Sequence, residues 1–111
     1  MQGGSRVLVT GGTGFVGSHL IEALSARAMR IRVLVRSTSD TTRLAGPNIE
    51  LIEGGLDDPA ALAQAVRDTE VVFHLAAATK ARSESEYDRV NAEGTRALVQ
   101  AVVQAQPRPR R

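Results

Sequence analysis

The stretch Thr10–Gly17, TGGTGFVG, decides the fold of this 111-residue chain. A short run rich in branched aliphatic residues precedes it at positions 6–10, and apolar residues recur at helical spacing after it. A glycine-rich turn between a buried strand and a helix presents backbone amides at the positive end of the helix dipole, where a diphosphate binds. The stretch therefore predicts a strand–turn–helix unit that holds a phosphate group.

Three glycines of this turn follow the spacing G-x-x-G-x-x-G, and each meets a different demand. Gly11 permits a tight turn with unusual backbone angles, Gly14 lets the main chain approach a diphosphate, and Gly17 lets the helix lie close to the sheet. A P-loop would end in Gly-Lys-Ser/Thr, whereas Gly17 is followed by Ser18 and His19. The pattern therefore excludes a nucleoside triphosphatase of the P-loop class.

The rest of the chain continues the alternation of strands and helices. Aliphatic runs predict strands at 6–10, 31–36, 49–53 and 71–75, and helical periodicity predicts helices from the glycine turn to 27, from 58 and over 85–104, with a helical turn at 40–44. This alternation predicts an α/β, Rossmann-type parallel sheet with strand order 3-2-1-4 and helices on both faces. Ligands bind in the crevice between strands 1 and 4, where the strand order reverses. We expect one domain over 1–105 and a basic Pro/Arg tail at 106–111.

Composition excludes several classes of function. Three of the 14 basic residues lie in the last four positions, and without them 11 basic residues face 12 acidic ones, so the domain has no basic surface for nucleic acid. Cysteine is absent, which excludes a disulfide framework and thiolate chemistry. No apolar run approaches the roughly 20 residues that span a membrane, and the two histidines are too far apart in sequence for a metal site. We therefore expect a cytoplasmic protein without membrane or nucleic-acid partners.

Five segments together resemble the short-chain dehydrogenase/reductase superfamily. Residues 10–17 match its T-G-x-x-G-x-x-G fingerprint, and further matches lie at 32–36, 53–59, 72–77 and 91–95. The extended branch of NAD-dependent epimerases/dehydratases and dihydroflavonol-reductase-like enzymes fits best, over about residues 5–104. The resemblance implies a dinucleotide site formed by Gly11, Thr13, Gly14, Phe15, Val16, Gly17, Arg36, Gly55, Leu56, Leu75, Ala76 and Ala77.

Two positions of this implied site affect the choice of cofactor. Arg36 would meet the adenosine ribose, where a guanidinium suits a 2′-phosphate, so we favour NADP over NAD; an exposed arginine at a strand end is the alternative. Gly55 stands where relatives have an Asp that contacts adenine. Asp57 lies beyond that position and Asp58 is better explained as a helix cap, so adenine recognition would rest on backbone groups.

Other conspicuous residues have plainer interpretations. His74 is interpreted as structural, His19 as a surface or packing residue, and Lys80 as a solvated loop residue. Ala28 stands where relatives carry a glycine at the end of the first helix, at a cost of about 1 kcal/mol if the left-handed geometry is kept. Gly94 implies close packing of the last helix against the sheet.

The family's catalytic Tyr-x-x-x-Lys pair has no counterpart here. The sole tyrosine is Tyr87, and Asn91 rather than lysine follows four residues later. We therefore predict no catalytic residues and expect the cofactor-binding portion of a truncated reductase, epimerase or dehydratase. A stand-alone NADP-binding or redox-sensing module and a non-functional remnant stay as alternatives. The fourth strand would form a bare edge through which the chain could self-associate.

Overall fold

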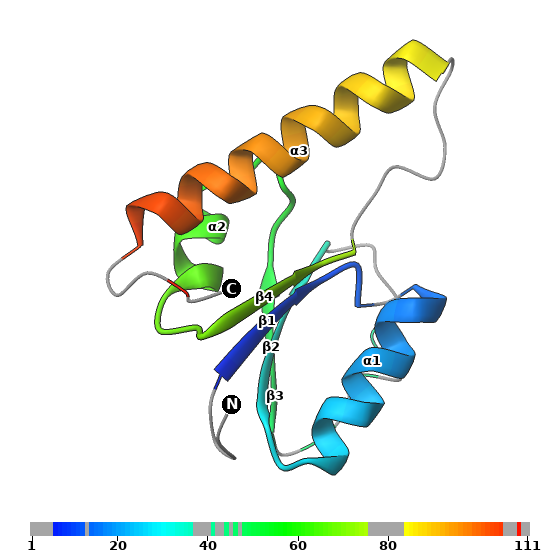
Figure 1. Cartoon of the computed structure of the whole chain (residues 1–111), viewed down its shortest axis with the longest axis vertical. Coiled ribbons are helices and arrows are strands. Elements are labelled where there is room, and N and C mark those ends of the chain that lie inside the picture. Colours follow the sequence, from blue (N-terminus) through cyan, green and yellow to red (C-terminus); the bar gives the residue numbers. More distant parts are fainter. Residues whose placement is uncertain are drawn as a thin grey trace.

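A parallel four-stranded sheet forms the centre of the molecule (Figure 1). The computed structural model describes residues 6–12, 14–36, 41, 44, 46, 48–75, 84–105 and 109, without the side chains of 84 and 86–90. The elements are β1 (Arg6–Thr10), α1 (Phe15–Ala26), β2 (Arg30–Val35), β3 (Ile49–Glu53), α2 (Pro59–Val66), β4 (Val71–His74) and α3 (Glu84–Gln104). All strand pairs are parallel and the order is β3-β2-β1-β4, which confirms the predicted topology.

The helices cover opposite faces of the sheet, α1 on one and α2 with α3 on the other (Figure 1). Alternate strand residues explain the two layers, because successive side chains of a strand point to opposite faces. Val7 and Val9 of β1 pack in the cluster with α1, whereas Leu8 packs in the cluster with α2 and α3. The core is therefore largely aliphatic and divided into two layers.

The helix ends follow local sequence signals. Asp58 caps α2, since its Oδ1 accepts the amide hydrogen of Ala61 at 3.1 Å, and Pro59 occupies the first helical position. Ala28 follows α1 with φ 58°, and its amide donates to the Ser25 carbonyl at 3.0 Å. The left-handed residue expected after α1 is therefore present, with alanine in place of glycine.

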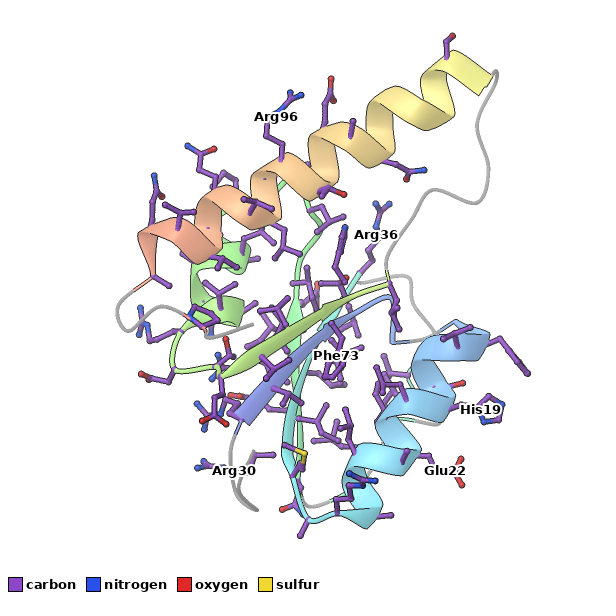
Figure 2. All side chains as sticks on the ribbon, viewed as in Figure 1. His19, Glu22, Arg30, Arg36, Phe73 and Arg96 are labelled. Atoms are coloured by element: carbon purple, nitrogen blue, oxygen red, sulfur yellow. The ribbon has the colours of Figure 1, made fainter. Side chains whose placement is uncertain are left out.

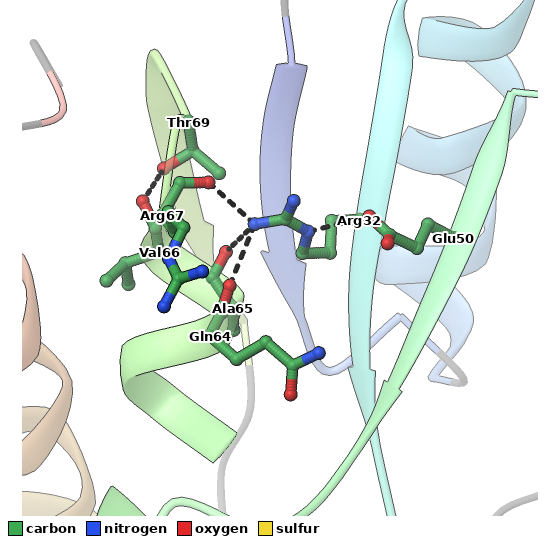
Figure 3. Close-up of polar contacts among 7 residues, drawn as sticks. All are labelled: Arg32, Glu50, Gln64, Ala65, Val66, Arg67 and Thr69. Carbon is green, nitrogen blue, oxygen red and sulfur yellow. Dashed lines mark hydrogen bonds and ion pairs between the residues drawn. The ribbon is translucent and has the colours of Figure 1, made fainter. Parts of the chain in front are cut away.

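A buried arginine connects the sheet to the end of α2, and sequence reasoning did not single it out (Figure 3). Arg32 is 5% exposed, and its guanidinium donates to the carbonyls of Gln64, Ala65 and Arg67 at 2.7–2.9 Å. Its Nε also bonds Glu50, the neighbouring residue on β3, at 2.8 Å. Because the last carbonyls of a helix lack partners within the helix, Arg32 acts as the C-terminal cap of α2.

Some expectations fall wholly or partly outside the described part of the chain. The helical turn expected at 40–44 is represented by one hydrogen bond, from the Leu44 amide to the Thr41 carbonyl at 2.9 Å. The tail at 106–111 is described only at Pro109, which is buried. Among the helices that the structure describes, none combines the length and apolar character needed to cross a membrane.

Candidate cofactor-binding site

The glycine turn joins the carboxyl end of β1 to the first turn of α1. Gly11 has φ 76°, a conformation that side chains with a Cβ rarely adopt, and its carbonyl accepts the Gly14 amide at 3.2 Å. A Cβ on Gly17 would overlap the Gly11 carbonyl and lie 2.8 Å from the Cα of Gly12. The sharp turn at Gly11 thus agrees with the sequence prediction, and Gly17 lets the helix lie directly against the turn.

The close approach of the turn to the sheet depends on Gly12, whose role the sequence analysis missed. A Cβ there would lie 2.6 Å from Cγ1 of Val33 on β2 and 2.7 Å from Cδ1 of Ile21 on α1. Gly17 thus packs on the turn that directly follows β1, and Gly12 packs between the sheet and α1. The sequence alone could not predict this role, because Val33 and Ile21 lie on other elements and contact Gly12 only in the folded chain.

The first turn of α1 is open to an anion. Gly14 is the N-terminal cap residue and has no side chain to cap the free amides, and no acidic residue lies in the first turn. The cap of α2 differs, because the Asp58 carboxylate already occupies that position. Apart from its chain neighbours, the described residues place only the Gly11 carbonyl within 4 Å of a Cβ on Gly14, at an ordinary 3.5 Å, so their packing does not require glycine there. Backbone amides at the start of a helix, with no side chain at Gly14 in front of them, fit a diphosphate group.

Two apolar side chains flank these amides in solvent. Phe15 and Val16 are the first two residues of α1, and their side chains are 79% and 64% exposed. The Phe15 ring meets the His19 ring edge-on with centroids 4.6 Å apart, and Figure 2 shows His19 directed away from the sheet. The structure thus places His19 on the surface, as expected. Thr13, the remaining predicted residue of the turn, lies outside the described residues.

Arg36 lies at the same edge of the sheet as the glycine turn. It directly follows β2, its side chain is exposed, and in Figure 2 it extends beyond the end of the strand. Because β1 and β2 are parallel neighbours, the residues that follow them lie at the same edge of the sheet. The guanidinium is therefore a charged group at this edge, and its contact with a cofactor stays a prediction.

The segment after β3 divides its two aspartates between different roles. Asp58 caps α2, whereas Asp57 is exposed and its Oδ1 lies 2.5 Å from the position that a Cβ on Gly55 would take. The carboxylate of Asp57 therefore occupies the space above Gly55 where a side chain at that position would begin. Sequence position alone could not show this, because the turn at 55–58 brings Asp57 back over Gly55.

Leu56 is partly buried and packs against the hydrophobic core. Its side chain packs against the cluster beneath α2 and α3, and its Cδ1 would lie 2.8 Å from a Cβ on Gly94. Gly94 is buried, and the atoms nearest to a Cβ there belong to Leu56, in the segment between β3 and α2, rather than to a strand of the sheet as expected. The predicted cofactor contact at Leu56 is therefore limited to the part of the residue that α3 does not cover.

A hydrogen-bonded chain crosses the edge where β1, β4 and α3 meet. The Thr10 hydroxyl lies 2.6 Å from Nδ1 of His74, and Nε2 of His74 lies 3.1 Å from the Thr95 hydroxyl. Burial lowers the pKa of His74 below its usual 6.5, which favours the neutral imidazole. These two hydrogen bonds place His74 in a structural role between the sheet and α3.

Leu75 lies at the carboxyl edge of the sheet, beside the end of β1. It follows β4, is 39% exposed, and its amide donates to the Thr10 carbonyl at 3.0 Å. Ala76, Ala77 and Lys80 lie outside the described residues, and of Tyr87 only the helical backbone is described. The described chain contains no cluster of acidic, histidine or cysteine side chains that could hold a metal ion.

A separate groove lies between α2 and α3. It has a volume of about 470 Å³ and is lined mainly by small and aliphatic side chains, among them Leu62, Val66 and Ala101. None of the residues predicted to bind the cofactor lines it. The glycine turn and this groove are therefore distinct features of the molecule.

Comparisons with known proteins agree with this geometry. Ceramide reductase of Caulobacter vibrioides is 39% identical over 95 residues, which cover 86% of this chain and 30% of that protein. The crystal structure of gox2253 has a TM-score of 0.77 and 42% identity, covering 87% of this chain and 30% of that one. The Bordetella bronchiseptica enzyme WbmH, solved in complex with NAD+, has a TM-score of 0.73 and 28% identity, covering 88% of this chain and 34% of that one.

These relatives are about three times as long as the part that matches, so the chain spans about 30% of the curated relative's length. A family model described as the NAD dependent epimerase/dehydratase family matches residues 7–110. Apart from Arg6 at the start of β1, that match includes the described helices and strands and the glycine turn between β1 and α1. The chain belongs to the NAD dependent epimerase/dehydratase family.

Proposed function

We propose that this chain binds a nicotinamide dinucleotide at the carboxyl edge of its sheet. The observation that carries the proposal is the open first turn of α1, where Gly14 leaves amides uncapped and adds no Cβ. An anion is stabilised there by the helix dipole and by direct hydrogen bonds. The NAD+ complex of the related WbmH supports a dinucleotide as the anion.

The diphosphate would lie over Gly11–Gly17, with the amides near Phe15 and Val16 as donors. The adenosine would extend past the ends of β2 and β3, toward Arg36 and the segment at Gly55 and Leu56. The nicotinamide side would extend past β4, along Leu75 and the alanines at 76 and 77. This path follows the crevice at the strand-order reversal.

NADP is the preferred cofactor in this proposal. Arg36 is exposed at the end of β2, and a guanidinium can form paired charged hydrogen bonds with a 2′-phosphate. An acidic residue at this position would instead accept from a 2′-hydroxyl. We expect Arg36→Ala to reduce NADP affinity by more than NAD affinity, and equal losses would contradict the preference.

In this proposal the chain supplies the cofactor site, and hydride transfer, epimerisation or dehydration would require the further residues of a longer protein. Tyr87 lacks a lysine four residues later, so the chain contributes cofactor binding and no proton-transferring pair. Among the described strands β4 pairs with β1 alone, and its outer edge would accept a further strand or a second copy of the chain.

Dinucleotide binding can be tested with two glycine variants of the full chain. Gly14 has φ −77° and ψ 175°, an extended conformation that valine adopts readily, so Gly14→Val should fold and obstruct the diphosphate. Gly46→Ala is the matched control, because Gly46 is exposed and far from the turn in sequence. Both should match the wild type in circular dichroism.

We expect NADPH fluorescence titration to show at least about tenfold weaker binding for Gly14→Val and no change for Gly46→Ala. A wild-type chain that binds neither NADPH nor NADH would refute the proposed function and favour a remnant without activity. Sedimentation of the same samples over a concentration series tests self-association, which a constant monomeric mass would exclude.

A further inference from the structure

We infer that His74 is a positioning residue that joins α3 to the phosphate-binding turn through Thr10. The inference deepens the proposed function and rests on it, because it concerns how the turn is held rather than what the turn binds. Three elements distant in sequence meet at this imidazole: β1, β4 and α3.

The sheet register explains why His74 reaches both partners. Thr10 and His74 are paired neighbours on β1 and β4, so their side chains point to the same face. That face is the one covered by α2 and α3, since Val72, two residues before His74, packs in the same cluster as Leu98 of α3. His74 therefore lies between a fully buried threonine and the inner side of α3.

Thr10 is fixed to β4 by its backbone as well as its side chain. Its carbonyl accepts the Leu75 amide at 3.0 Å, while its hydroxyl lies 2.6 Å from Nδ1 of His74. The next residue, Gly11, has φ 76° and accepts the Gly14 amide. The orientation of Thr10 is thus passed directly to the turn whose amides would receive the diphosphate.

The same contacts argue against a role for His74 in proton transfer. A neutral imidazole donates from one nitrogen and accepts at the other, and both nitrogens here face a threonine hydroxyl. Threonine hydroxyls can donate or accept, so the two bonds are satisfied together without an ionised group. With both ring nitrogens engaged, none is directed at a substrate.

Among the described residues, charged groups lie on α3 beside Thr95 and after the end of β2. On α3, Glu93 and Arg96 flank Thr95 in sequence and are exposed, and Arg36 follows β2 at the same edge. Burial alone accounts for the lowered pKa of His74, so these charges are not what holds the ring neutral. The threonine contacts, rather than an ion pair, define the geometry.

Removal of the outer contact tests the inference without disturbing the core. Thr95 is exposed, so Thr95→Val should fold normally while breaking the bond to Nε2 of His74. Arg96→Ala is the matched control, because Arg96 is the next residue and points away from the sheet in Figure 2. We expect Thr95→Val to weaken NADPH binding by about three- to tenfold, the value of one net hydrogen bond, and Arg96→Ala to leave it unchanged.

Two substitutions of His74 separate hydrogen bonding from packing. His74→Asn retains an amide near the position of Nδ1 and should keep the Thr10 contact, whereas His74→Phe fills the space without either bond. We expect His74→Asn to bind NADPH more weakly than wild type and His74→Phe to bind more weakly still. Equal affinity of His74→Phe and wild type would overturn the inference.

The amide chemical shifts of the glycine turn provide a second measurement, because an effect confined to α3 would not change them. In ¹H–¹⁵N spectra of the unliganded chain, Thr95→Val should shift the signals of Gly11, Gly12 and Gly14, and Arg96→Ala should not. Unshifted turn signals together with unchanged NADPH affinity in Thr95→Val would overturn the inference even if the His74 variants failed to fold. Failure of the wild type to bind any dinucleotide would instead refute the proposed function.

Discussion

Among the residues that the structure describes, two that are not glycine adopt left-handed backbone conformations. Ala28 follows α1 with φ 58°, and Asp68 follows α2 with φ 59°. Aspartate tolerates this region better than alanine because its short polar side chain can bond locally. The family resemblance correctly identified Ala28 as the strained position, since the end of a helix and its usual glycine can be recognised from sequence.

Replacement of Ala28 by glycine should stabilise the chain. Glycine removes the Cβ clash in the left-handed region, and we expect the free energy of unfolding to rise by about 1 kcal/mol in urea denaturation. Ala23→Gly is the control, because Ala23 is exposed within α1 and its loss of helix propensity should cost about 1 kcal/mol. A lower stability of Ala28→Gly than wild type would contradict the strain at this position.

At the scale of elements, local sequence predicts where helices and strands begin, while side chains from elsewhere complete their ends. The start of α2 was readable from Asp58 and Pro59, which lie beside it. The end of α2 depends on Arg32 from the middle of β2, more than 30 residues away. An arginine in a strand predicted to be buried indicates a partner, but its identity requires the packing of β2 beneath α2.

Loss of Arg32 should strongly destabilise the contact between the sheet and α2. Arg32→Met keeps an apolar stem but leaves three carbonyls without the guanidinium, and we expect a cost of about 3 kcal/mol in thermal or urea unfolding. Glu50→Gln should cost less, because the Glu50 side chain is 53% exposed. Similar costs for the two variants would show that the ion pair, and not the helix cap, is the main contribution.

At the scale of the whole molecule, two titrating groups on the α2–α3 face connect stability to pH in separate ranges. Burial lowers the pKa of His74 below 6.5, and the Arg32 guanidinium lowers the pKa of Glu50 below 4.5. In both cases the unfolded chain takes up its proton first as the pH falls. The stabilising contribution is therefore complete above the unfolded pKa and is lost as the pH falls through the folded pKa.

We expect the free energy of unfolding to decrease as the pH falls below about 6.5, and to decrease again below about 4.5. Urea titrations at a series of pH values should show the upper step in wild type and not in His74→Asn. The lower step should be reduced in Glu50→Gln. A wild-type profile that stays flat between pH 7 and 5 would contradict the burial of a neutral His74.

From sequence alone one could predict the Rossmann-type topology and the sharp glycine turn, which the structure confirms, and the carboxyl edge as the candidate ligand site, which stays a prediction. These features depend on the periodicity of apolar residues and on the spacing of glycines, and both can be recognised from residues close together in the sequence. The tertiary structure alone decided the packing of Gly12, the Arg32 cap, the Asp57 carboxylate above Gly55 and the Thr10–His74–Thr95 chain. The partners of Gly12, Arg32 and His74 lie on other elements, and even Asp57 reaches Gly55 only through the turn between them, so each contact is defined once the chain has folded.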